Sequence, residues 1–174
     1  MRVISGLYKG KQLEGFNING TRPTMDRVKE SMFAMLQGYL KDSIVLDLFA
    51  GAGNLGIEAI SNGATCYFVD NNKIAIETII KNTIDMDNKF IMKKDCFDAL
   101  EYFKINNIKF DIILLDPPYH ENLMDKIINK IIKDDLLKKN GLIVCELEEE
   151  ITCDLKLIKN KKYGLKKVKM FQKS

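Results

Sequence analysis

The sequence predicts an α/β fold built around a parallel β-sheet. From Ser43 onward, short apolar runs alternate with longer segments of helical periodicity, which is the pattern of βαβ units. A glycine-rich loop, residues 51–56, directly follows the first apolar run. At 174 residues, the chain has the length of one domain. We therefore expect a single domain over residues 1–174, with an α/β core at 43–174 and an N-terminal extension at 1–40.

The core is expected to contain five strands separated by four helices. The strands are expected at 44–48, 66–70, 89–93, 110–116 and 142–146. The helices are expected at 54–62 with Gly63 as its stop, through 76–83, around 97–103, and at 122–138 with Gly141 as its stop. Apolar residues at helical spacing support the last helix: Ile127, Ile128, Ile131 and Ile132.

Both ends of the chain depart from this regular alternation. Residues 2–18 predict a small hairpin, and 24–37 predict an amphipathic helix with Thr24 as its N-cap. Residues 155–172 predict two strands hinged at Tyr163-Gly164, with lysines facing water. The side chains expected to pack are those on the apolar faces of these elements: Val28, Met32, Phe33 and Leu36 in the helix, and Leu155, Leu157, Leu165, Val168 and Met170 in the strands.

Composition excludes several classes of protein. Hydrophobic residues make up 46% and charged residues 29% of the chain, as in soluble globular proteins. We find no apolar run long enough to cross a membrane and no signal peptide, so we expect a cytoplasmic protein. Neither a zinc site nor a disulfide framework is expected, because the only histidine is His120 and the four cysteines form no C-x-x-C pair. We interpret these as mostly small core residues: Cys66, Cys96, Cys145 and Cys153.

The net charge of +3 conceals basic ends. Residues 1–30 hold six Lys or Arg against three Asp or Glu, and residues 156–174 hold eight lysines and no acid. The remaining residues, 31–155, therefore carry a net charge of −8. Basic segments suit a polyanion, because each neutralised phosphate releases counterions. A solvated lysine face is the alternative interpretation.

The glycine loop favours a nucleotide-like ligand. Gly51, Gly53 and Gly56 fit G-x-G-x-x-G between a predicted strand and a predicted helix, and Asp70 ends the next strand 19 residues past Gly51. A carboxylate at that spacing can accept hydrogen bonds from ribose hydroxyls. Asp47, before the loop, would oppose a pyrophosphate. It favours S-adenosylmethionine, which carries a cationic sulfonium and ammonium, over a nicotinamide or flavin. Asp95 either accepts the adenine amine or caps a helix, and both can hold.

The fourth predicted strand runs into Asp116-Pro117-Pro118-Tyr119. Two prolines end ladder pairing and fix the backbone there. Asp116 and the Pro117 carbonyl can accept hydrogen bonds from an exocyclic base amine, and Tyr119 can stack on the base. Holding the amine nitrogen in line with the methyl group of S-adenosylmethionine would supply most of the rate acceleration. We interpret His120 as a surface or substrate-rim residue and leave Glu146 unassigned.

These motifs together are similar to a known family. Residues 47–58 and the 116–119 corner resemble class I S-adenosylmethionine-dependent methyltransferases that modify exocyclic amines. Residues 21–30, with 2–6 and Lys9-Gly10, resemble the RsmD family of 16S ribosomal RNA guanine-N2 methyltransferases. The resemblance implies a Rossmann-like, seven-stranded, mostly parallel sheet whose last strand is antiparallel, with helices on both faces. It also implies 16S ribosomal RNA as partner, within a partly or fully assembled small subunit, and we expect a monomer.

The resemblance also implies the residues of the site. The catalytic corner would consist of Asp116, Pro117, Pro118 and Tyr119. The S-adenosyl-L-methionine pocket would be lined by Thr24, Asp47, Phe49, Gly51, Gly53, Asp70, Asn71, Asp95 and Cys96. Two alternatives stay open: an adenine-N6 methyltransferase acting on DNA or RNA, and a non-catalytic RNA-binding module that keeps the fold.

Overall fold

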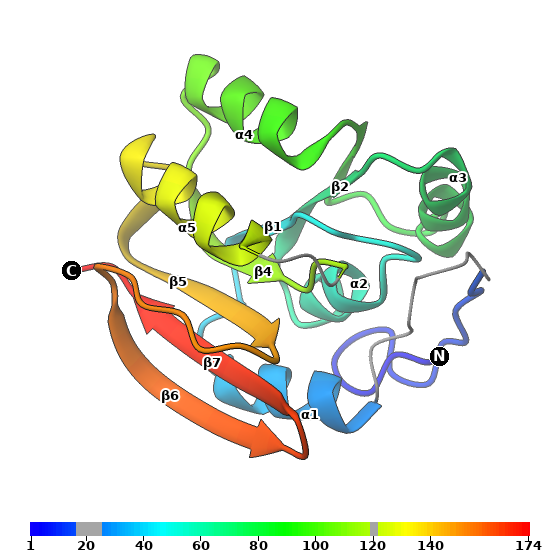
Figure 1. The fold of residues 1–174 in the computed structure, drawn as a ribbon. Coiled ribbons are helices and arrows are strands. Elements are labelled where there is room, and N and C mark those ends of the chain that lie inside the picture. The colour runs from blue at the N-terminus through cyan, green and yellow to red at the C-terminus, as the bar shows by residue number, and fades with distance from the viewer. Residues whose placement is uncertain (17–25, 119–121) are drawn as a thin grey trace.

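A twisted seven-stranded sheet forms the middle layer of the protein (Figure 1). In this computed structural model we describe residues 1–16, 26–118 and 122–174. The strands are β1 (Ile44–Asp47), β2 (Thr65–Asp70), β3 (Lys89–Lys93), β4 (Phe110–Leu115), β5 (Leu137–Leu147), β6 (Lys156–Tyr163) and β7 (Lys166–Gln172). Their order is β3-β2-β1-β4-β5-β7-β6, and β7 is antiparallel to both of its neighbours. The expected mostly parallel sheet with its last strand antiparallel is confirmed.

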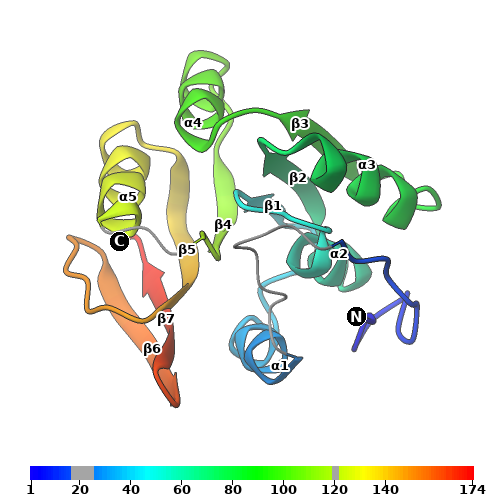
Figure 2. The ribbon, with the colours of Figure 1, turned by 45° about the vertical axis from the view of Figure 1, so that its right-hand side comes forward.

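Helices cover both faces of the sheet, as expected (Figure 2). They are α1 (Asp26–Met35), α2 (Asn54–Ser61), α3 (Lys73–Asn82), α4 (Cys96–Ile105) and α5 (Leu123–Lys133). One apolar core lies between the sheet and α1 to α3, and the other lies between the sheet and α4 and α5. Among the described residues, no helix combines the length and apolar character that crossing a bilayer requires.

The strand that precedes the glycine loop and the strand that ends at Leu115 are neighbours. Parallel pairing joins Val45 to Ile112 and Asp47 to Leu114. The carboxyl ends of β1 and β4 therefore open on one edge of the sheet. This adjacency is the geometric condition that the predicted site requires, and it is confirmed.

The N-terminal extension packs against the first core. The predicted apolar face of α1 is buried, with Val28, Met32 and Leu36 fully enclosed. Within the described part of the predicted 2–18 hairpin, one antiparallel bridge joins Arg2 to Gln12, and backbone hydrogen bonds from Val3 to Lys11 and from Leu13 to Met1 flank it. The predicted N-cap, Thr24, lies outside the described residues.

The predicted helix at 122–138 is too long, and its expected stop at Gly141 is wrong. Helix α5 ends at Lys133, and Asp135 adopts a left-handed backbone with φ 52°. Strand β5 then begins at Leu137 and includes Gly141. A side chain at position 141 would put Cβ 2.7 Å from the Lys138 carbonyl oxygen, so this glycine permits an irregularity within the strand. The apolar residues after Lys133 are buried because they join the second core.

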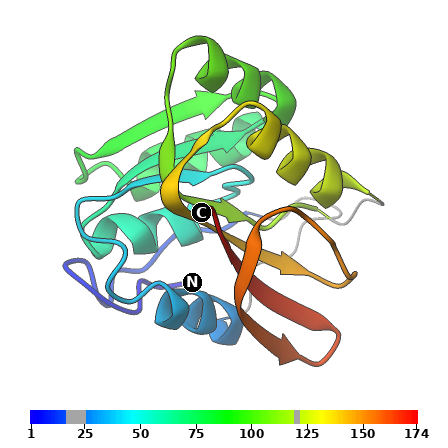
Figure 3. The same ribbon diagram turned by 90° about the vertical axis from the view of Figure 1, so that its left-hand side faces the viewer.

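The C-terminal hairpin is confirmed (Figure 3). The assignment of its side chains to buried and exposed faces is partly wrong. Val168 and Met170 are buried as expected, whereas Leu157 is 44% exposed and Leu165 is 81% exposed. Lys169 is buried although the sequence predicts that it faces water, because its ammonium pairs with Glu150 at 2.6 Å. A lysine is tolerated at such a position when its charge is paired.

The cysteines act as packing residues in this fold. All four carry free thiols. Cys66 and Cys145 are buried, as expected of core residues, whereas Cys96 and Cys153 are half-buried. Within the described residues, no three His, Cys, Asp or Glu side chains gather closely enough to hold a metal ion.

Candidate cofactor and substrate site

Three carboxylates meet at the carboxyl edge of the sheet. Asp47 ends β1, Asp70 ends β2, and Asp116 directly follows β4. Parallel strands carry these residues to the same edge. The negative charges of Asp116 and Asp70 both act on Asp47. The structure thus brings together the acids that the sequence places at the cofactor loop and at the reacting corner.

Asp47 is held in an environment that disfavours its charge. Its side chain is 1% exposed, and its Oδ2 atom accepts a 2.9 Å hydrogen bond from the Gly56 N–H. Burial raises its pKa to about 7, the Gly56 hydrogen bond opposes that rise, and the charges of Asp116 and Asp70 add to it. A cationic ligand would stabilise the ionised form, whereas an anionic ligand would be repelled.

Asp70 organises the glycine loop. Its Oδ2 atom accepts a 2.8 Å hydrogen bond from the Gly51 N–H, and its Oδ1 atom accepts one of 2.9 Å from Asn72. Gly51 and Gly53 both have positive φ, 56° and 88°, which glycine adopts without steric cost. The spacing of 19 residues between Gly51 and Asp70 therefore corresponds to a direct contact that fixes the loop.

Gly56 has a packing role distinct from that of the loop glycines. A Cβ atom at position 56 would lie 2.3 Å from Phe68 Cε1 and 2.7 Å from Cys66 Sγ. Helix α2 can therefore approach β2 closely only because residue 56 has no side chain. At Gly51, in contrast, an added Cβ would meet nothing within 4 Å, so the backbone there faces open space at the sheet edge.

The remaining predicted cofactor residues follow β1, β2 and β3. Asp95 is exposed and caps α4 by accepting hydrogen bonds from the N–H groups of Phe97 at 2.8 Å and Asp98 at 3.4 Å. The capping interpretation of Asp95 is thus confirmed, and its role toward adenine stays a prediction. Cys96 and Phe49 are half-buried, and Asn71 is exposed directly after β2.

The reacting corner is described as far as Pro118. Asp116 and Pro117 are partly exposed and Pro118 is exposed, so the corner is accessible at the end of β4. Tyr119 and His120 lie outside the described residues, as does Thr24, and their expected roles stay predictions.

Sequence reasoning missed a buried polar network beneath the loop. Lys29 on α1 is fully buried and pairs with Glu58 on α2 at 3.0 Å. Its ammonium also donates to Asn54 Oδ1 at 2.7 Å and to the Arg2 carbonyl at 2.8 Å. Glu58 in turn accepts hydrogen bonds from the N–H groups of Ile4 and Ser5. The network ties the N-terminal extension to the helix that opens at the glycine loop.

Glu146, which the sequence leaves unassigned, stands beside the reacting corner. Leu115 pairs with Cys145, so Glu146 is level with Asp116. Its side chain is buried, one carboxylate oxygen pairs with Lys166, and the other has no hydrogen-bond partner among the described residues. The position of Glu146 could not be predicted because the sequence alone does not give the register of β5 against β4.

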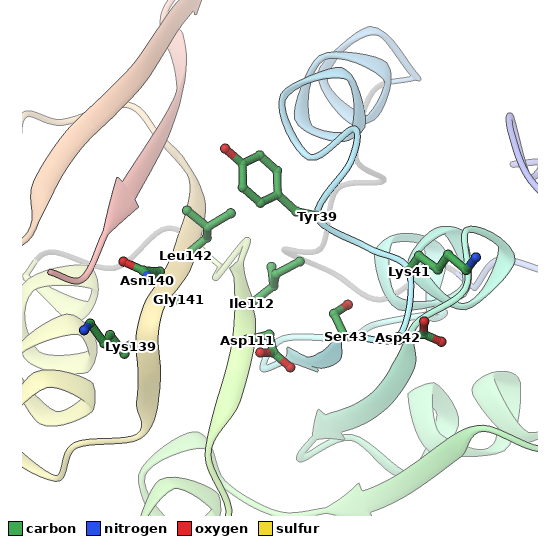
Figure 4. A pocket seen from close by; sticks show the side chains of 10 residues that line it. All are labelled: Tyr39, Lys41, Asp42, Ser43, Asp111, Ile112, Lys139, Asn140, Gly141 and Leu142. Carbon is green, nitrogen blue, oxygen red and sulfur yellow. The ribbon is translucent and has the colours of Figure 1, made fainter.

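A cavity of about 240 Å³ lies at the opposite edge of the sheet (Figure 4). It is formed at the amino ends of β1, β4 and β5 and includes none of the predicted site residues. Asp111, on its wall, accepts a hydrogen bond from the Ile44 N–H at 2.8 Å and pairs with Lys138 at 3.1 Å. These interactions give Asp111 a structural role in joining three strands.

Comparisons with known proteins agree with this architecture. The solved structure of the Escherichia coli protein yhhF has a TM-score of 0.87, with 26% identity over 100% of this chain and 98% of that one. An RNA methyltransferase from Salinibacter ruber, solved with S-adenosyl-L-homocysteine, has a TM-score of 0.69 at 15% identity, over 87% of this chain and 93% of that one; it is similar in fold. The fold is that of a Rossmann-like class I methyltransferase.

Sequence comparisons identify the family. Residues 1–172 match the family model described as conserved hypothetical protein 95. The Haemophilus influenzae protein named ribosomal RNA small subunit methyltransferase D is 35% identical over 99% of this chain and 93% of its own length. The chain belongs to the RsmD family of ribosomal RNA small-subunit methyltransferases.

Proposed function

We propose that this protein transfers a methyl group from S-adenosyl-L-methionine to the exocyclic N2 amine of a guanine in 16S ribosomal RNA. Membership of the RsmD family supports the substrate class. The adjacency of β1 and β4 carries the chemistry, because it puts the cofactor loop and the Asp116 corner on one edge. A non-catalytic RNA-binding module would not require these two features to converge.

The described residues fit S-adenosyl-L-methionine. The carboxylate-rich edge around Asp47 matches a cationic ligand and opposes a pyrophosphate. The open space at Gly51 lets the backbone approach a ligand closely. We assign the pocket to the residues named from the sequence, with Asp47, Gly51, Gly53 and Asp70 at its centre. When bound, the cofactor supplies an electrophilic methyl group on a sulfonium.

The protein's own contribution is chiefly to position the amine. The lone pair of an exocyclic base amine is delocalised into the ring, so the nitrogen is a poor nucleophile. Asp116 and the Pro117 carbonyl accept hydrogen bonds from the amine and hold its nitrogen toward the methyl group. The fixed backbone of Pro117 and Pro118 limits motion, and we retain Tyr119 as the residue that stacks on the base. With the cofactor held by Asp47, Gly51, Gly53 and Asp70, the amine nitrogen would accept the methyl group that it supplies and would lose one proton to solvent.

We place this activity in a single domain, acting as a monomer in the cytoplasm on a partly or fully assembled small subunit. The test is incubation with isotopically labelled S-adenosyl-L-methionine and small subunits that lack the modification, followed by mass analysis of the RNA nucleosides. Label in N2-methylguanosine is expected. Label in N6-methyladenosine would favour the adenine alternative, and absence of label in RNA would contradict the proposal.

A matched variant tests the corner itself. Asp116→Asn keeps the size of the side chain and removes its charge. We expect it to lower kcat by on the order of a hundredfold, because small losses of alignment have effects of that size. Binding of S-adenosyl-L-methionine, measured by calorimetry, should weaken by much less than kcat falls. Equal losses in cofactor binding and in kcat would contradict the assignment of Asp116 to the amine.

A further inference from the structure

The turn of the C-terminal hairpin lies at the same edge of the sheet as the reacting corner. Glu146 on β5 is level with Asp116 and pairs with Val168 on β7. Val168 in turn pairs with Lys161 on β6. Lys161 is therefore on the rung that runs from Asp116 across the sheet. Three strand spacings of about 4.8 Å separate β4 from β6, or roughly 14 Å.

The lysines of the two hairpin strands differ in their partners. On β7 and just after it, the lysines pair with carboxylates: Lys166 with Glu146, Lys167 and Lys169 with Glu150, and Lys173 with Asp135. On β6, Lys161 and Lys162 are exposed and pair with no carboxylate within the described part of the chain. The uncompensated positive charge of the basic C-terminal segment thus lies on the outermost strand of the sheet.

A second element adds to this charge at the hairpin turn. Arg27, near the start of α1, stands over the Tyr163 ring with its guanidinium carbon 5.9 Å from the centroid. The Lys161 ammonium lies 5.5 Å from the same centroid. Tyr163 is half-buried and packs against the first core. The ring therefore fixes two cations from different parts of the chain beside the carboxyl edge.

We propose that Arg27 and Lys161, which lie over the Tyr163 ring, bind the RNA strand that flanks the target guanine, together with Lys162, the next exposed residue of β6. We call these four residues the hairpin surface. The inference rests on the proposed function, since it names where that RNA lies. Phosphate groups are the ligand, because guanidinium and ammonium groups bind them without reading sequence. A strand whose base is held at Asp116 would pass over β5 and β7 to reach this surface.

Protection of a sheet edge is the competing explanation for these lysines. Natural proteins place lysines on exposed edge strands to prevent pairing with other chains. That explanation concerns the whole length of β6, whereas the hairpin surface concerns only its end at the reacting edge. Lys156 provides the contrast, because it is exposed at the other end of β6, where it pairs with Gln172.

The test compares two double variants with the same loss of charge. Lys161→Gln/Lys162→Gln removes two cations of the hairpin surface. Lys139→Gln/Lys156→Gln removes two exposed cations at the amino edge. Binding of a 16S ribosomal RNA fragment without cofactor is measured by fluorescence anisotropy over a range of salt concentrations. The KM for small subunits, kcat and the Kd of S-adenosyl-L-methionine are measured alongside.

We expect the hairpin variant to raise the RNA Kd and the KM about tenfold at physiological salt. The log–log salt slope should fall by about 1.4, or about 0.7 for each phosphate that is no longer neutralised. The kcat and the cofactor Kd of this variant should stay within about twofold of the wild type, because the hairpin surface holds neither the cofactor nor the reacting amine. The amino-edge variant should match the wild type.

Two results would overturn the inference. One is an equal effect of the two double variants, and the other is aggregation of the hairpin variant with unchanged RNA affinity. If the wild type binds RNA but methylates none, the proposed function fails while the anisotropy comparison still decides the role of the hairpin surface.

Discussion

Replacing Asp47 by asparagine separates the stability of the fold from affinity for the cofactor. Asparagine keeps an acceptor for the Gly56 N–H and nearly the same volume, but it carries no charge. In the wild type, burial raises the pKa of Asp47 to about 7, against about 3.9 in an unfolded chain. Between these two values the folded protein holds a proton that the unfolded chain has lost. The stability of the wild type therefore falls as the pH rises from about 4 to about 7, and then levels off.

The size of the effect follows from the same shift. Each pKa unit corresponds to about 1.4 kcal/mol, so the raised pKa of Asp47 lowers the stability of the fold by about 4 kcal/mol at pH 8 and by about 1 to 2 kcal/mol at pH 5. We expect Asp47→Asn to be more stable than the wild type, with the larger gain at pH 8. Urea unfolding at the two pH values measures the difference. A loss of stability at pH 8, or a change in stability that does not depend on pH, would refute the reasoning.

The same variant should bind the cofactor poorly. A charge-assisted interaction is worth about 1.5 to 3 kcal/mol, so the Kd of S-adenosyl-L-methionine should rise about ten- to a hundredfold. Calorimetry at pH 8 gives this value. Unchanged affinity would remove Asp47 from the cofactor site even if the stability prediction holds.

The remaining predictions concern the pH dependence of cofactor binding, the buried ion pair, the helix contact and the cap. In the wild type, the Kd of S-adenosyl-L-methionine should rise by up to about tenfold per pH unit below about 7, because bound cation requires ionised Asp47; calorimetry that finds a constant Kd from pH 8 to pH 6 would exclude this linkage. Lys29→Met should destabilise the fold by about 3 to 5 kcal/mol in urea unfolding, since it leaves Glu58 buried without its partner. Gly56→Ala should cost about 1 to 3 kcal/mol through the clash with Phe68, and an unperturbed unfolding midpoint would contradict the close packing. Asp95→Ala should lower the free energy of unfolding by about 1 kcal/mol through removal of the cap. A raised cofactor Kd in this variant would support the predicted contact of Asp95 with adenine.

Two controls make these measurements specific. Lys73→Met removes an exposed ion pair to Glu77 whose charged atoms are 3.8 Å apart, and it should cost less than about 0.5 kcal/mol. Asn72→Ala removes the cap of α3, where the Asn72 side chain accepts from the Ile74 and Ala75 N–H groups. It should match Asp95→Ala in stability without changing the interaction with adenine. A loss of stability in Lys73→Met as large as in Lys29→Met would contradict the role of burial.

The strands and the loop could be predicted because their signals are local. Apolar runs define β1 and β4, and the chemistry of the residues that follow them defines the two halves of the site. That these two halves are adjacent could be predicted only from the resemblance to a known fold. In the structure, the pairing of Asp47 with Leu114 shows directly that β1 and β4 are neighbours. Local signals failed where tertiary packing decides the structure. Helical spacing continues past Lys133, but the left-handed turn at Asp135 sends the next apolar residues into a strand.

Buried polar groups were the least predictable part of the site. Lys29 occupies the apolar face of α1, three and four residues before Met32 and Phe33, and this position is the one signal of its burial. Its partner Glu58 is 29 residues away, so spacing along the chain could not identify the pair. Lys169 likewise has the sequence signature of a surface residue, because its pairing with Glu150 depends on how the segment after β5 returns to the sheet.

A crystal structure with bound S-adenosyl-L-methionine tests most directly whether the methyl donor and the amine acceptors meet at one edge. We predict that the sulfonium lies between Asp47 and the Asp116 corner, with its methyl group facing the space in front of Asp116 and the Pro117 carbonyl, where the amine nitrogen is held. A cofactor seated elsewhere, or one whose methyl group points away from Asp116 and Pro117, would contradict the account.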